Sequence, residues 1–449
     1  MKKVVVQVGN ILLGSANRNI PIQTMCNTPT SDVEASYLQC RQLYESGADM
    51  VRLAVQGERE VSAFEQVTNR LRRAGIAVPL IADVHFSYRI ALKVAPVADK
   101  VRINPGNFAK DHRMAREQFS ALTEICKKYG TSIRIGVNHG SLGERIVERF
   151  GNSPEGMKEA AKEWISMAEA DGFDQIVISL KSSNTKVMVE AYRSLYADMV
   201  SKGVVYPLHL GVTEAGNGDM GRIKSAIGIS SLLKEGVGDT IRVSLTENPI
   251  NEISVAQHIL HFSGHKPELP PIVPSDRQKI IHRHYEAENY EAFIINASCE
   301  LGPLLMDGVI DDVVLSAKVD GEELTSDKIS NFRDELLQSS RRKFSKPEYI
   351  ACPGCGRTLF DLENTFNEVK RRTSHLKGYV IAVMGCVVNG PGEMADADYG
   401  YVGEGRGKVS LYRGKHPVIK GVSEREAVDR LLEIILQDAR NRDDHPRNG

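Results

Sequence analysis

The chain has 449 residues, a formal net charge of −1 at pH 7 and an apolar content of 41%. This length predicts two or three domains with ordinary hydrophobic cores. A net charge near zero excludes a global field that would attract nucleic acid or an anionic membrane, so any anion site must be local. The seven cysteines follow no disulfide framework, and no stretch approaches the roughly 20 apolar residues of a membrane span, so we expect a soluble, cytoplasmic protein.

Eight short β-branched runs recur along the first half of the chain, and helix-like stretches separate them. The runs are IPIQTMC (20–26), ADMVRLAV (48–55), VPLIADVHF (78–86), DKVRINPG (99–106), SIRIGVNHG (132–140), QIVISLKS (175–182), PLHLGVTE (207–214) and DTIRVSL (239–245). Such continuous apolar runs are typical of parallel strands that are buried on both faces. They predict an α/β fold with an N-terminal (β/α)8 TIM barrel over residues 1–262, and a doubly wound open sheet is the alternative.

Polar side chains stand at the ends of these runs, where a barrel has its active-site mouth. They are Arg52, Asp83, His85, Arg102, Asn104, Arg134, Asn138, Lys181, His209, Glu214 and Arg242. Five of them are cations from five strands, and crowding five positive charges is costly unless an anion lies between them. Arginine forks suit phosphate oxygens, so we predict that a phosphorylated small molecule binds there. For any single arginine, a salt bridge to a neighbouring helix is the alternative.

Two histidines and one glutamate at these strand ends are candidates for contacting the ligand or moving a proton. His85 and His209 either touch the ligand or are hydrogen-bonded core residues, and the sequence leaves both possibilities open. Glu214 stands just before a glycine turn in LGVTEAGNG. Apart from Asp83 it is the only carboxylate at the predicted mouth, so Glu214 is the better candidate for moving a proton.

The C-terminal quarter holds a candidate metal site in ACPGCGRT (351–358) and MGCVVNGPGE (384–393). A zinc ribbon would need a second CxxC motif or a Cys/His pair after the first, and neither follows. Three thiolates with a carboxylate suit an iron-sulfur cluster with one labile iron better than structural zinc. The thiolates are those of Cys352, Cys355 and Cys386. Glu393 is the first candidate for the fourth ligand, with Cys299 and His375 as alternatives.

Several long motifs carry a resemblance to a known family. They include ADVHFSYRIALKV, RINPGN, IRIGVN, HLGVTEAG, CPGCGR and NGPGE, in this order along the chain. Together they resemble the 4-hydroxy-3-methylbut-2-enyl diphosphate synthases, the iron-sulfur enzymes of the non-mevalonate isoprenoid route. The resemblance covers residues 1 to about 260 and about 346 to the end.

The resemblance implies one 4Fe-4S cluster, held by Cys352, Cys355, Cys386 and Glu393. It places the diphosphate-binding residues at Arg52, Arg102, Arg134, Lys181 and Arg242, with Asn138 beside them, and an acid at Glu214. It implies reductive ring opening of 2-C-methyl-D-erythritol 2,4-cyclodiphosphate to the allylic diphosphate, with two electrons from ferredoxin or flavodoxin. In short members of the family the two domains close over the substrate between the chains of a dimer, so we expect a homodimer.

Residues 263–345 depart from the short members of the family. Long members carry a larger middle domain at this place, so we interpret this segment as a reduced middle domain between the barrel and an α+β cluster domain over residues 346–449. His282 and His284 have a spacing that could bind a metal, but we interpret them as part of a solvated helix face. The glycine-rich VGEGRGKV (402–409) predicts a hairpin turn.

Two other functions compete with the enzyme that the resemblance implies. One is a barrel aldolase or isomerase that acts on a sugar phosphate and carries a structural zinc ribbon; it needs no electrons. The other is an iron-sulfur sensor whose barrel binds an isoprenoid precursor without turning it over. Metal analysis separates the first from the enzyme, and product formation under reductant separates the second.

Overall fold

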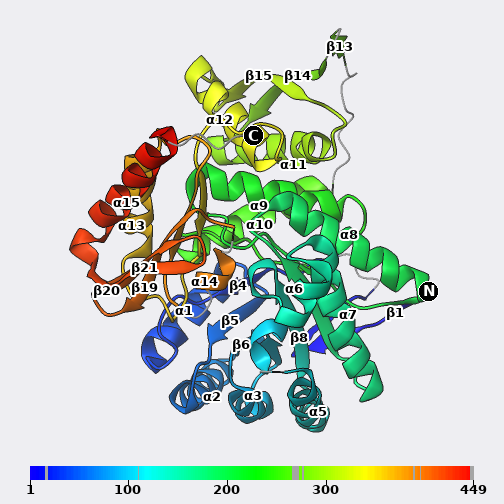
Figure 1. The fold of residues 1–449 in the computed structure, drawn as a ribbon. Coiled ribbons are helices and arrows are strands. Elements are labelled where there is room, and N and C mark those ends of the chain that lie inside the picture. Colours follow the sequence, from blue (N-terminus) through cyan, green and yellow to red (C-terminus); the bar gives the residue numbers. More distant parts are fainter. Residues whose placement is uncertain are drawn as a thin grey trace.

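The computed structural model describes residues 1–15, 19–109, 111–264, 273–275, 278–387, 390–394 and 396–444. Figure 1 shows a barrel, a smaller unit of strands and helices beside α9, and a C-terminal domain that lies against the barrel. No helix in these ranges is both long enough and apolar enough to cross a membrane.

Eight parallel strands form the barrel in the described part of the chain. They are β4 (Gln23–Met25), β5 (Met50–Ala54), β6 (Leu80–Asp83), β7 (Lys100–Ile103), β8 (Ser132–Asn138), β9 (Ile176–Lys181), β11 (His209–Leu210) and β12 (Thr240–Ile241). The strands from β4 to β9 pair in chain order, and β11 pairs with β12. Bridges between Ile178 and Leu208 and between Ile22 and Ile241 join the two sheets into a closed ring. The predicted (β/α)8 barrel is therefore confirmed, and the open doubly wound sheet is excluded.

Helices alternate with the strands and cover the outside of the barrel (Figure 1). They are α1 (Val33–Glu45), α2 (Glu58–Arg73), α3 (Tyr88–Val94), α5 (His112–Tyr129), α7 (Pro154–Ala170), α8 (Thr185–Ser201), α9 (Gly218–Leu233) and α10 (Pro249–Ser263), with the short α4 (Pro105–Phe108) and α6 (Glu144–Phe150). Local sequence sets where many of them begin. Asp111, for example, accepts a hydrogen bond from the Met114 amide at the start of α5. Amphipathic spacing decides which face of each helix packs on the barrel; α2, for example, buries Phe64, Val67 and Leu71.

The N-terminal residues close the end of the barrel that lies opposite the predicted mouth. β1 (Lys2–Lys3) pairs with β10 (Val204–Val205), and β2 (Val6–Val8) forms a hairpin with β3 (Ile11–Leu13). The hairpin lies beside the segments that lead into the strands: the Gln7 amide donates to the Gln175 side chain, just before β9. Only the carboxyl end of the barrel is therefore left for a site.

The middle unit is built on four strands and two helices in the described residues. It comprises β13 (Val273–Ser275), β14 (Gln278–Ala287), β15 (Asp312–Val319), β16 (Glu322–Glu323), α11 (Tyr290–Met306) and α12 (Ser326–Ser339). α11 packs so closely on α9 that a side chain at Gly302 would place its Cβ 2.9 Å from the Cδ1 atom of Ile227. Buried residues of this unit belong to the same hydrophobic core as the barrel, so it is firmly attached to it.

The helix expected around His282 and His284 is wrong, because both residues lie on the exposed face of β14. Their strand pairs in parallel with β15, and His282 lies opposite Val314 in the register. This pairing joins residues about thirty positions apart, so local charge and spacing did not predict it.

The C-terminal domain has a five-stranded mixed sheet in the order β17-β18-β19-β20-β21. Its elements are β17 (Glu348–Ala351), β18 (Val380–Met384), β19 (Tyr399–Gly405), β20 (Lys408–Arg413), β21 (His416–Ser423), α13 (Leu362–Thr373), α14 (Gly390–Glu393) and α15 (Glu424–Asp444). β17, β18 and β19 are parallel, and the remaining pairs are antiparallel. The predicted hairpin turn in residues 402–409 is confirmed, since β19 and β20 are joined through Gly407, whose φ is 68°.

Candidate active site

The C-terminal domain contacts the carboxyl ends of the barrel strands within one chain. Ala215 forms a β-bridge with Ala351, whose amide donates to the Glu214 carbonyl over 3.3 Å. The Thr246 hydroxyl donates to the Cys352 carbonyl over 2.8 Å. Glu214 has a φ of 48°, a left-handed conformation that is unusual for a residue other than glycine and is often found at functional sites.

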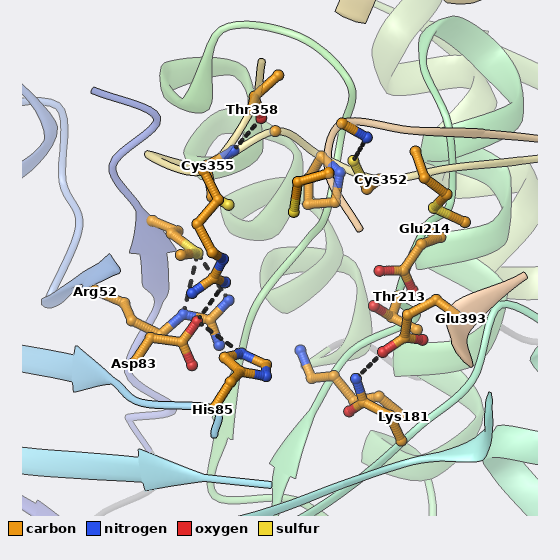
Figure 2. A pocket seen from close by; sticks show the side chains of 18 of the residues that line it. Arg52, Asp83, His85, Lys181, Thr213, Glu214, Cys352, Cys355, Thr358 and Glu393 are labelled. Atoms are coloured by element: carbon orange, nitrogen blue, oxygen red, sulfur yellow. Dashed lines mark hydrogen bonds and ion pairs between the residues drawn. The ribbon is translucent and has the colours of Figure 1, made fainter. Parts of the chain in front are cut away.

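A cavity lies where the two domains meet, and Figure 2 shows the side chains that point into it. Most of the residues predicted from the strand ends and the cysteine motifs line it: Arg52, Asp83, His85, Arg102, Arg134, Asn138, Lys181, Glu214, Arg242, Cys352, Cys355, Cys386 and Glu393. The barrel supplies the cations, and the C-terminal domain supplies the thiols. The fold thus brings together residues that are up to 341 positions apart in the chain.

Two predicted site residues do not line this cavity. The Asn104 amide donates to the Ser141 hydroxyl, and its carbonyl oxygen accepts from the Gly106 amide, so it caps α4. His209 is fully buried in the barrel, and neither ring nitrogen has a hydrogen-bond partner in the described part of the chain. A direct substrate contact for either residue stays a prediction.

The cations at the mouth are buried and crowded. Arg134 is 1% exposed; its Nε donates to Ser179 over 3.1 Å, but one terminal nitrogen has no partner among the described residues. Burial, together with the charges of Arg134, Arg242 and Arg52, lowers the pKa of Lys181 well below its usual range. Burial also lowers the pKa of Arg52 to about 9. Such crowding of positive charge is costly, and an anion with several oxygens would relieve it.

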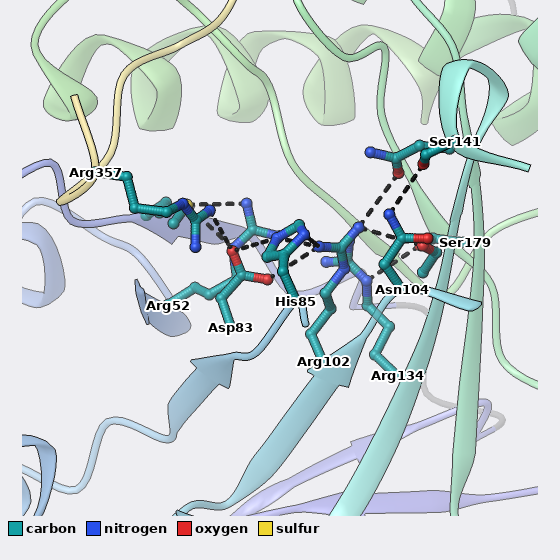
Figure 3. A network of polar contacts seen from close by, with 12 residues as sticks. Arg52, Asp83, His85, Arg102, Asn104, Arg134, Ser141, Ser179 and Arg357 are labelled. Atoms are coloured by element: carbon teal, nitrogen blue, oxygen red, sulfur yellow. Dashed lines mark hydrogen bonds and ion pairs between the residues drawn. The ribbon is translucent and has the colours of Figure 1, made fainter. Parts of the chain in front are cut away.

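Asp83 is the main counter-charge of this group (Figure 3). Its carboxylate lies 3.3 Å from Arg102, 3.2 Å from His85 and 2.9 Å from Arg357. Burial opposes its charge, but Arg52, Arg102 and Arg357 hold the pKa of Asp83 well below its usual range. His85 is neutral at physiological pH, because burial and Arg102 lower its pKa to about 3.

Arg242 is held from outside the strand ring by Glu252 on α10. Its Nη2 and Nε atoms lie 2.9 Å and 3.2 Å from the two Glu252 oxygens. The same carboxylate accepts hydrogen bonds from the Thr24 hydroxyl and the Leu245 amide. Both members of the pair are buried, so the guanidinium is fixed in one orientation toward the cavity.

Two carboxyl groups face each other where the domains meet, Glu214 from the barrel and Glu393 from α14 (Figure 2). Burial raises the pKa of Glu214, while Lys181 and Arg242 oppose that rise. Burial and the neighbouring Glu214 raise the pKa of Glu393 well above its usual range. The Asn138 amide donates to Glu393. Without a bound group, this arrangement favours one proton shared between the two carboxyls.

The thiols of Cys352, Cys355 and Cys386 line the same cavity as Glu393. The Gly385 amide donates to the Cys352 sulfur over 3.2 Å, and such bonds stabilise a thiolate. No three His, Cys, Asp or Glu side chains in the described ranges converge closely enough to hold one metal ion. In a 4Fe-4S cluster each thiolate binds a different iron, so its ligands stand further apart than those of one zinc ion. The donor set fits such a cluster.

The alternative fourth ligands lie elsewhere. Cys299 is buried in α11, where its thiol donates to the Ala226 carbonyl of α9. His375 is exposed just beyond the end of α13. Neither lines the cavity.

Sequence reasoning missed several residues that line the cavity, among them Met25, Arg357 and Thr358. The Met25 sulfur accepts hydrogen bonds from Arg52 over 3.2 Å and 2.9 Å. The Thr358 hydroxyl accepts from the Cys355 amide over 3.0 Å, and Arg357 reaches Asp83. Met25 and Thr358 carry no charge that would mark them in the sequence, whereas the position of Arg357 in the CPGCGR motif is a signal that identifies it as a candidate.

Comparison with known proteins shows the family to which this chain belongs. Residues 3–257 match the GcpE TIM-barrel domain, and residues 348–437 match the GcpE protein C-terminal domain. The chain belongs to the GcpE family. These two matches coincide with the two parts of the chain that form the cavity.

Curated GcpE relatives match along almost the whole chain. A relative from Parabacteroides distasonis is 34% identical over 97% of this chain and 98% of its own length. One from Porphyromonas gingivalis is 35% identical over 97% of each chain, and one from Chlamydia caviae is 34% identical over 96% of each. All three are named 4-hydroxy-3-methylbut-2-en-1-yl diphosphate synthase (flavodoxin). The first alignment extends over 601 positions, so this GcpE relative carries residues that the 449-residue chain lacks.

Proposed function

We propose that this chain catalyses the reductive ring opening of 2-C-methyl-D-erythritol 2,4-cyclodiphosphate to 4-hydroxy-3-methylbut-2-enyl diphosphate. The reaction consumes two electrons and releases one water, and the relatives' names support flavodoxin as the donor. The observation that carries the proposal is the cavity in which buried barrel cations face three thiols and a carboxylate. The cations match a diphosphate, and the sulfur donors match the group that must supply electrons.

The barrel would hold the diphosphate through Arg52, Arg102, Arg134, Lys181 and Arg242, with Asn138 beside them. Arg134 and Arg102 each have a buried nitrogen without a partner among the described residues, and phosphate oxygens would satisfy both. Because Glu252 and Ser179 fix Arg242 and Arg134 from outside the cavity, these guanidinium groups are oriented before the substrate arrives.

A 4Fe-4S cluster bound by Cys352, Cys355, Cys386 and Glu393 would deliver electrons singly and offer the substrate one exchangeable iron. Glu214 lies beside Glu393, so its carboxyl would be placed to protonate the hydroxyl that leaves as water. Lys181 and Arg242 lie close enough to Glu214 to oppose the rise in its pKa. The proposed acid therefore lies among the cations that would bind the diphosphate.

We also propose the domain division 1–262, 263–345 and 346–449, with closure within one chain. The contacts of Ala215 with Ala351 and of Asn138 with Glu393 support this, because all four residues belong to the same polypeptide. The middle unit packs on α9 and is followed directly by β17. It would therefore hold the cluster domain close to the barrel of the same chain. A homodimer remains the predicted assembly.

Anaerobic purification with iron, sulfide and zinc analysis tests the proposed cofactor. We expect a brown protein with about four irons and four sulfides per chain. The same sample should convert the cyclic diphosphate under a chemical reductant. Colourless protein with one zinc after cluster reconstitution would favour the sugar-phosphate aldolase or isomerase. A loaded cluster with substrate binding but no product would favour a sensor.

Mixing two inactive variants tests where closure occurs. Arg134→Ala removes a substrate contact from the barrel, and Glu393→Ala removes the proposed labile ligand from the cluster domain. If the domains close within one chain, each chain carries one defect and the mixture stays inactive. Recovery of activity upon subunit exchange would show that a barrel closes with the cluster domain of another chain.

A further inference from the structure

Arg357 belongs to the cluster loop, yet its side chain reaches into the barrel. It follows Cys355 by two residues in ACPGCGRT. Its Nη2 atom lies 2.9 Å from the Oδ2 atom of Asp83, at the end of β6, and the two side chains are 6% and 1% exposed (Figure 3). The pair thus links the cysteine motif directly to the counter-charge of the barrel cations.

The same guanidinium lies in the electrostatic field of the thiols. Arg357 lines one cavity together with Cys355 and Cys386, and its ion pair with Asp83 lies in that cavity as well. Arg357 is therefore a permanent positive charge between the proposed cluster ligands and the barrel mouth.

One donor of Arg357 is unsatisfied within the described part of the chain. Its Nε is buried and lacks a hydrogen-bond partner there. A buried donor is normally satisfied, so this nitrogen points to an acceptor that a bound group supplies. A purely structural role explains the residue less well, because Asp83 already has Arg102 and His85 as partners.

We propose that Arg357 is a positioning residue that Asp83 holds beside the cluster thiols, so that domain closure sets a fixed positive charge against the cluster. This rests on the proposed function, since it requires the cluster to be present. A cation next to the sulfurs stabilises the more negative, reduced form of the cluster and raises its reduction potential. Closure would then make the cluster easier to reduce.

A redox titration of the full-length, cluster-loaded chain tests this inference without substrate. The reduced cluster is followed by electron paramagnetic resonance in the wild type, Arg357→Met and Arg357→Lys. Arg371→Met is the matched control, because it removes the same charge from an exposed position on α13. At the wild-type midpoint we expect the ratio of reduced to oxidised cluster to be about tenfold lower in Arg357→Met, which corresponds to a potential about 59 mV lower. Arg357→Lys and Arg371→Met should stay near the wild type.

Each outcome decides a different point. Wild-type protein without a cluster would refute the proposed function and not the placement of Arg357. A loaded Arg357→Met variant with the wild-type potential, or with the same shift as Arg371→Met, would refute the inference. If Arg357→Met holds no cluster, Arg357→Gln takes its place in the titration. If neither neutral variant holds a cluster and Arg357→Lys turns over normally, Arg357 serves cluster assembly and the inference is wrong.

Discussion

Gly140 provides the sharpest test of the arrangement of the two domains. It lies in the loop after β8, close to the backbone of α14, which carries Glu393. A side chain at Gly140 would place its Cβ 2.9 Å from the Glu393 amide nitrogen and closer still to the Gly392 carbonyl oxygen. Gly140 has no left-handed φ, so alanine is compatible with its own backbone.

The expected magnitude follows from this close approach. Carbon atoms reach ordinary contact at about 3.5 Å, so Gly140→Ala must push α14 away by roughly 1 Å. A displacement of about 1 Å at a reacting centre costs on the order of 100-fold in rate. We therefore expect turnover to fall about 100-fold while the cluster content, its absorption spectrum and the barrel's melting temperature stay unchanged.

The assay is anaerobic turnover of the cyclic diphosphate with a chemical reductant. Gly143→Ala is the matched control, since nothing lies within 4 Å of the Cβ it would add and its φ of −61° suits alanine. It should retain activity within about twofold. Wild-type turnover in Gly140→Ala would refute the reasoning, because the reacting state would then not contain this contact.

Three further variants test individual residues. Glu252→Gln leaves the buried Arg242 without its charged partner, so we expect a loss of about 3 kcal/mol of stability and a KM at least tenfold higher with an unchanged cluster spectrum. Glu117→Gln, which removes an exposed ion pair, is the control, and an equal effect in both would contradict the assignment. Glu393→Ala should keep a cluster on three thiolates but lose nearly all turnover; unaffected turnover would rule out the ligand role. His85 has a pKa of about 3 in the folded chain, below its unfolded value of about 6.5, so its contribution to stability is complete above pH 6.5 and falls as the pH drops toward 3. Between pH 6.5 and 5 the wild type should lose about 2 kcal/mol more stability than His85→Gln, and an imidazole that titrates near pH 6 by NMR would contradict this.

The barrel and most of its mouth could be predicted because they follow from local rules. Parallel barrel strands place their carboxyl ends at one face, so Arg52, Arg102 and Arg134 had to converge once eight units were recognised. Asn104 stands at a strand end but does not line the cavity, because the chain turns into α4 directly after β7 and the Asn104 side chain caps that helix.

Contacts between distant segments could not be predicted in this way. Arg357 and Asp83 are 274 positions apart, and nothing near either residue indicates the other. Glu252 lies on a helix face that would ordinarily pack against apolar residues, and only the closed ring shows that it meets Arg242. The strand at His282 likewise depends on its pairing with β15, which local spacing does not reveal.

The unsatisfied donors connect substrate binding with domain closure. Arg102 and Arg134 in the barrel, and Arg357 in the cluster loop, each have a buried nitrogen without a partner among the described residues. A bound diphosphate would satisfy donors on the barrel side, while closure brings the third cation and Glu393 to the same cavity. Under the proposed function, each event would thus lower the electrostatic cost of the other. Thermodynamic linkage then requires that closure strengthens substrate binding by the same factor by which bound substrate strengthens closure, so Gly140→Ala, which weakens closure, should also weaken the binding of the substrate.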